Sequence, residues 1–104
     1  MITFHETNYK KLTKYQKELQ HTVQSDVMYL FNEECGLEIE FTCAASDKPD
    51  SLELYIMTSE KDLDEEKVVD KINRQPFDWQ LIRGKCSLFQ IVKKPQSQIL
   101  IGQL

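Results

Sequence analysis

The chain has 104 residues, of which 40% are hydrophobic and 29% charged, and its 17 acidic and 13 basic side chains give a net charge of −4. This length and composition suit one hydrophobic core, so we expect a single domain spanning residues 1–104. The apolar runs are far shorter than the roughly 18 residues of a membrane-spanning helix, and the start of the chain lacks the pattern of a signal peptide. We therefore expect no membrane span and a cytoplasmic location.

The first predicted element is a long helix from Thr7 to Glu34. Its inward side chains recur at three- and four-residue steps, at Tyr9, Leu12, Gln16, Leu19, Val23, Val27, Leu30 and Phe31. Gly36 would supply the C-terminal stop. At about 1.5 Å per residue this helix would be roughly 40 Å long, so it must break near residues 21–25 or project from the domain.

A hairpin of two half-buried strands is predicted next. Apolar residues alternate from Leu37 to Ala45, and again from Leu52 to Met57 after a polar, turn-rich segment. If Ala45 pairs with Leu52, then Phe41 meets Ile56 and the apolar faces of both strands agree.

A short second helix follows, with Asp64 as its N-cap and acidic side chains in its first turn. Its apolar stripe is Val68, Val69 and Ile72, and Pro76 ends the segment at about Arg74. The acidic run also has the spacing that opens a calcium loop, but lysine stands where such a loop needs glycine. The capped helix start is the better interpretation.

The last third is predicted to form strands at 77–82, 86–92 and 99–101, with a turn at residues 83–85. Pairing Ile82 with Cys86 places one apolar set on each face of this hairpin. One face carries Trp79, Leu81, Phe89 and Ile91, and the other carries Ile82, Leu88 and Val92. The expected fold is α+β with two layers, an antiparallel sheet of four to five strands and two helices, in the order α-β-β-α-β-β-β.

The signatures of catalysis and cofactor binding are missing from the sequence. Three scattered glycines form no phosphate-binding loop, and three dispersed cysteines and two distant histidines form no zinc site. We expect no cofactor, no metal, reduced thiols and no enzymatic activity. Basic residues near Trp79 and Phe89 could contact nucleic acid, but residues 25–70 hold fourteen acids against three lysines, and that balance argues against it.

Protein binding is the function that the sequence favours. On the hairpin face opposite the apolar stripe, aromatic and methionine side chains lie among carboxylates, namely Glu38, Glu40, Glu53, Tyr55 and Met57. This composition suits a basic partner, although an ordinary solvated sheet face has the same pattern. The leading hypothesis is an inhibitor or immunity-type protein that neutralises a basic toxin, nuclease or nucleic-acid-handling enzyme.

A second hypothesis is a homo-oligomeric adaptor or regulatory subunit, such as a homodimer. Its interface would be the apolar C-terminal hairpin, through Trp79, Leu81, Phe89 and Ile91, because two helices leave little to cover a second apolar sheet face. A small enzyme or a nucleic-acid binder comes third.

Overall fold

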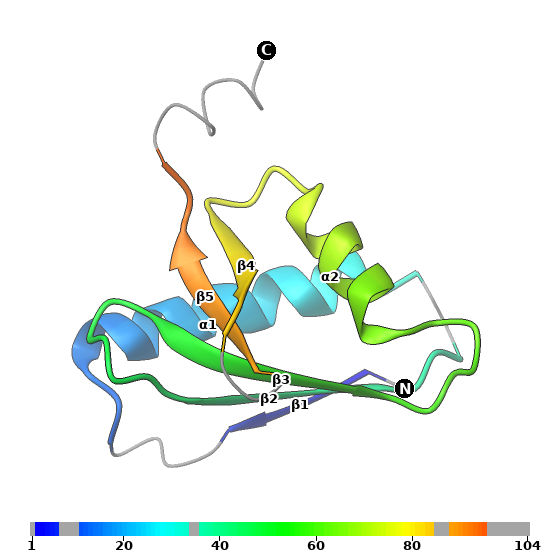
Figure 1. Cartoon of the computed structure of the whole chain (residues 1–104), viewed down its shortest axis with the longest axis horizontal. Helices are drawn as coiled ribbons and strands as arrows, with labels where there is room; N and C mark the ends of the chain where they lie inside the picture. The colour runs from blue at the N-terminus through cyan, green and yellow to red at the C-terminus, as the bar shows by residue number, and fades with distance from the viewer. Residues whose placement is uncertain (1, 7–10, 34–35, 85–87, 96–104) are drawn as a thin grey trace.

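The structure, a computed structural model, describes residues 2–6, 11–33, 36–84 and 88–95. In this part of the chain two helices pack on one five-stranded sheet, with the element order β1-α1-β2-β3-α2-β4-β5. Both helices lie on the same side of β1 to β3, and β4 and β5 run steeply across the direction of those three strands (Figure 1). The predicted two-layer α+β class is confirmed.

The sheet begins with a strand that the sequence analysis did not predict. β1 (Ile2–Glu6) pairs in parallel with β2 (Ile39–Ala45), whereas all other neighbours in the order β1-β2-β3-β5-β4 are antiparallel. The sheet is therefore mixed rather than antiparallel. Phe4 anchors β1 because its ring stacks on that of Phe41, with centroids 6.0 Å apart.

α1 (Lys14–Leu30) is shorter than predicted at both ends. Thr13 caps its start, since Gln16 N donates to the Thr13 hydroxyl and Thr13 N donates to Gln16 Oε1. The helix ends before Phe31 rather than near Gly36, which has a φ of +92° in the connection to β2. At 17 residues, or about 25 Å, it fits the domain without breaking. Residues 7–10, where the helix was predicted to begin, lie outside the described residues.

The central hairpin forms as predicted. β2 and β3 (Leu52–Thr58) pair in the expected register, with Ala45 opposite Leu52 and Phe41 opposite Ile56. Gln16 of α1 ties the connecting loop to the helix, because its side-chain Nε2 donates to the carbonyl oxygens of Lys48 and Ser51 at 3.1 and 3.0 Å.

α2 (Glu65–Asn73) also begins where the sequence predicts. The Asp64 side chain accepts a 2.9 Å hydrogen bond from Lys67 N, and Arg74 is the C-cap. Asn73 then bonds to the outer edge of β4 (Trp79–Arg83). Its side chain donates to Leu81 O at 2.9 Å and accepts from Leu81 N at 2.8 Å, so the helix closes this edge of the sheet.

The register of the last hairpin differs from the prediction by four residues. Ile82 lies opposite Gln90 of β5 (Phe89–Lys93) instead of Cys86, because the connection is longer than a tight turn and Gly84 N donates to Leu88 O at 2.8 Å. An even shift keeps every side chain on its expected face. The turn residue Lys85, Cys86 and the strand expected at 99–101 lie outside the described residues.

The core fills the space between the sheet and the helices. Its members include Val23, Val27 and Phe31 from α1 and its cap, Val68 and Ile72 from α2, and alternate residues of β2 to β5. Cys43 is also buried among them, as a small apolar side chain on β2. No helix in the described residues is long and apolar enough to cross a membrane.

Candidate functional site

The five predicted contact residues lie on the sheet face opposite the helices. Glu38, Glu40, Tyr55 and Met57 are exposed and Glu53 is half-buried, whereas their apolar sequence neighbours on β2 and β3 are buried in the core. Tyr55 is 39% and Met57 is 49% exposed. The shared exposed face expected from period-two alternation is therefore present in the fold. We call it the open face.

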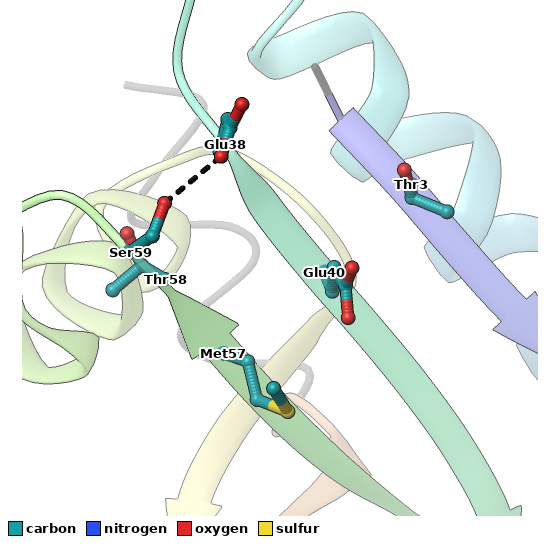
Figure 2. Close-up of a pocket in the computed structure, with 6 residues that line it drawn as sticks. All are labelled: Thr3, Glu38, Glu40, Met57, Thr58 and Ser59. Atoms are coloured by element: carbon teal, nitrogen blue, oxygen red, sulfur yellow. Dashed lines mark hydrogen bonds between the residues drawn. The ribbon is translucent and has the colours of Figure 1, made fainter.

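Three of the five predicted residues line one depression of about 380 Å³. Glu40 lies opposite Thr3 of β1 on one side and Met57 of β3 on the other, so these three side chains form a row across the sheet. Figure 2 shows Glu40 between the flanking strands and Glu38 just ahead of β2. Thr58 and Ser59 complete the wall, and we call this hollow the acidic depression.

Each of the two carboxylates has a polar neighbour. The Ser59 hydroxyl donates a 3.0 Å hydrogen bond to Glu38 Oε2, drawn as the dashed line in Figure 2. Glu40 Oε2 lies 3.9 Å from His5 Nε2, a distance that makes an ion pair only when the imidazole is protonated. The depression thus presents two carboxylates beside the Met57 thioether.

The other two predicted residues lie further along the open face. Glu53 lines a second depression of about 490 Å³, together with charged side chains of both signs that include Lys48 and Arg83. Tyr55 occupies the row between the two depressions and lines neither of them. The predicted site is thus a strip along β2 and β3 with the exposed Tyr55 ring at its middle.

The chemistry of the acidic depression suits a cation on an apolar stem. Carboxylates accept hydrogen bonds from ammonium or guanidinium groups, and the flexible Met57 side chain packs against methylene groups. The described residues contain no cluster of three or more side chains that could hold a metal ion.

The residues predicted as an oligomer interface are buried in the domain's own core, which corrects that prediction. Trp79, Leu81, Phe89 and Ile91 are at most 3% exposed. Trp79 Nε1 donates a 2.7 Å hydrogen bond to Asp26 Oδ2, so α1 covers the face that a second chain was expected to cover. The rings of Trp79 and Phe89 are likewise unavailable for stacking on nucleic-acid bases.

Sequence reasoning missed the side chains that border the acidic depression. Thr3 and His5 lie ahead of the predicted first helix, and Ser59 lies between the predicted second strand and second helix. A signal existed for the first two, because Ile2 and Phe4 alternate with Thr3 and His5 as in a strand with one buried face. Nothing in the sequence indicates that Ser59 reaches Glu38.

A second surface that the sequence did not reveal lies where the two helices end. Tyr29 is 84% exposed and lines a depression of about 370 Å³ with Leu30, Pro76 and Phe77. Phe77 stacks on Trp79 with ring centroids 5.3 Å apart, so the floor of this surface is fixed to the core.

No protein-family model, curated protein or solved structure matches the chain.

Proposed function

We propose that this protein is a cytoplasmic module that binds another protein stoichiometrically, through the acidic depression and the neighbouring open face. The partner is basic and inserts a lysine or arginine side chain between Glu38 and Glu40. A toxin, a nuclease or another nucleic-acid-handling enzyme has the required positive surface, and the module would then act as its inhibitor.

The observation that carries this proposal is the combination of charge and shape at the acidic depression. Two carboxylates, Glu40 of β2 and Glu38 just ahead of it, share one hollow with Met57, and Glu38 accepts a hydrogen bond from the Ser59 hydroxyl. A solvated sheet face needs no such concavity, whereas an inserted side chain does.

Electrostatics and packing contribute differently to the proposed complex. An exposed ion pair contributes only about 0–1 kcal/mol, so the carboxylates mainly accelerate association and select a basic partner. The lifetime of the complex depends on Tyr55 and Met57, whose exposed apolar area is buried on docking.

The experiment compares capture by the wild type with capture by two charge-matched variants. The first variant is Glu38→Gln with Glu40→Gln, and the control is Glu18→Gln with Asp50→Asn, two exposed acids outside the acidic depression. Each variant loses two negative charges. Proteins captured from a lysate of the native host are identified by mass spectrometry, and association rates are then measured at several salt concentrations.

We expect a basic protein to be held by the wild type and the control and lost by the variant at Glu38 and Glu40. That variant should also associate more slowly and with a weaker dependence on salt, while its melting temperature stays nearly unchanged. Equal capture by all three proteins would refute the proposal and leave the acidic depression as solvated surface.

A second candidate function, that of a self-associating adaptor, has support only at the surface around Tyr29. This exposed ring beside Pro76 and Phe77 has the composition of an interface anchor. Sedimentation of the wild type and of Tyr29→Ser at micromolar concentration tests it, because a monomeric wild type would rule out this function.

A further inference from the structure

The two edges of the sheet differ in how they are protected. At β4, the Asn73 side chain occupies both the N–H and the C=O of Leu81, so a new strand cannot pair there without displacing α2. At β1, no hydrogen bond among the described residues reaches the outer edge. Every second residue of an edge strand turns its N–H and C=O away from its neighbour, so within the described part of the chain β1 offers unpaired backbone groups.

The sequence of β1 also lacks several of the features that block edge pairing. It contains no lysine and no proline, and its register with β2 is continuous from Ile2 to Glu6 without a bulge. Its side chains alternate between the faces, with Thr3 and His5 on the open face and the half-buried Ile2 and Phe4 against the core. A strand added here would extend both faces.

From these observations we infer that the partner's basic segment binds as an extended strand added to the outer edge of β1, with its alternate lysine or arginine side chains on the open face. This inference rests on the proposed function and specifies how the partner reaches the acidic depression. The apolar side chains that alternate with the basic ones would cover Ile2 and Phe4.

The geometry of the row at Thr3 suits this arrangement. An added residue opposite Thr3 would lie two strand spacings, or about 10 Å, from Glu40. A lysine's four-carbon stem and the glutamate's own side chain span that gap together. Thr3, whose short side chain lines the depression, leaves the path between them open.

The negative charge of the acidic depression favours a basic protein, and not a second copy of this chain, as the partner that pairs with the edge of β1. Pairing β1 with β1 of another copy would bring the carboxylates of two acidic depressions toward one another. Such like-charge contacts oppose association, whereas a basic segment relieves the repulsion between Glu38 and Glu40.

The test uses the full chain and a synthetic peptide in which lysine and valine alternate over seven positions, blocked at both ends. Two further peptides carry backbone N-methyl groups, one on every lysine and the other on every valine. In an added strand the N–H groups of one set face β1 and those of the other face solvent. N-methylation removes these donors and leaves the charge unchanged. Affinities and chemical-shift changes are measured by NMR titration.

We expect the parent peptide to shift the amide signals of residues 2–6 and of Glu40. One methylated peptide should bind at least about tenfold more weakly, because it loses several hydrogen bonds to β1, and the other should stay within about threefold. Which of the two loses affinity reports whether the added strand runs parallel or antiparallel to β1. Glu38→Gln with Glu40→Gln should weaken the parent peptide more than the control variant at Glu18 and Asp50 does.

Three outcomes would overturn the inference in distinguishable ways. If both methylated peptides bind like the parent while the variant at Glu38 and Glu40 loses affinity, the basic segment binds by charge without pairing, and only the edge inference fails. If binding is indifferent to those two glutamates, the proposed function fails as well. A dimer joined through β1 that excludes the peptide would identify a second copy as the occupant and also refute the inference.

Discussion

The hydrogen bond between Trp79 and Asp26 gives a sharp test of how α1 is held on the sheet. The Trp79 indole is fully buried, and its only polar atom donates to a carboxylate on α1 at 2.7 Å. Replacing Asp26 with alanine leaves that N–H without its acceptor. Asp26→Asn keeps an acceptor oxygen and removes only the charge.

The expected loss of stability follows from three contributions. A hydrogen bond to a charged group contributes about 1.5–3 kcal/mol. Alanine's higher helix propensity returns about 0.5 kcal/mol at this position in α1, and partial exposure of Asp26 lets water reach the vacated site. We expect Asp26→Ala to lower the free energy of unfolding by about 1–2 kcal/mol, and Asp26→Asn by about half as much.

Urea titration provides the assay, because Trp79 is the only tryptophan and reports on its own burial. Repeating the substitution in a Trp79→Phe background, followed by circular dichroism, completes a double-mutant cycle. In that background Asp26→Ala should be neutral or slightly stabilising, since no donor is stranded. An equal cost in both backgrounds would show that the effect arises elsewhere and would refute the reasoning.

The remaining predictions concern the helix caps, the sheet edge and the exposed aromatic ring. Asp64→Ala should cost about 1 kcal/mol in urea titration through loss of the N-cap bond, whereas Asp62→Ala should cost little, and the reverse order would contradict the cap assignment. Gln16→Ala should cost about 2 kcal/mol or more, because it removes the capping box and the bonds to the hairpin loop together, and a neutral result would disprove that role. Asn73→Ala should accelerate amide hydrogen exchange at Leu81 relative to the rest of the sheet, and unchanged exchange would show that Asn73 does not guard the edge. Tyr29→Ser should change the free energy of unfolding by less than about 0.5 kcal/mol, and a larger loss would mean that the ring is packed in solution.

Local patterns predicted the middle of the molecule well. The β2–β3 register follows from alternation alone, because a one-residue slip would turn Phe41 and Ile56 out of the core. The start of α2 follows equally from Asp64, whose carboxylate has a chemical reason to lie at a helix N-terminus.

Predictions that depended on distant contacts were less complete. β1 is five residues long, and its parallel pairing with β2 is specified by Phe4 meeting Phe41 across the whole of α1. The register of β4 and β5 depends on a connection longer than a tight turn. The packing of α1 over Trp79 involves a hydrogen bond from the indole to the carboxylate of Asp26. The spacing of apolar residues within one segment does not indicate which distant segment that segment will contact.

For the candidate site, alternation placed Glu38, Glu40 and Met57 on one face, and the depression needs in addition the neighbouring strand β1 and the Ser59 hydroxyl. The sequence therefore predicted which side chains share the exposed face, but not the depression, which also requires Thr3 of β1 and Ser59.

The position of β5 between β3 and β4 has a consequence for how the chain is made. β5 is the last described strand along the sequence, yet it joins two strands that leave the ribosome before it. Until β5 emerges, β4 has no partner strand among the described residues, and Leu52 and Leu54 of β3 pair with β2 alone. The domain therefore completes its sheet after nearly all of the described chain has been synthesised, and a nascent chain halted at the connection after β4 carries an open apolar edge that chaperones recognise.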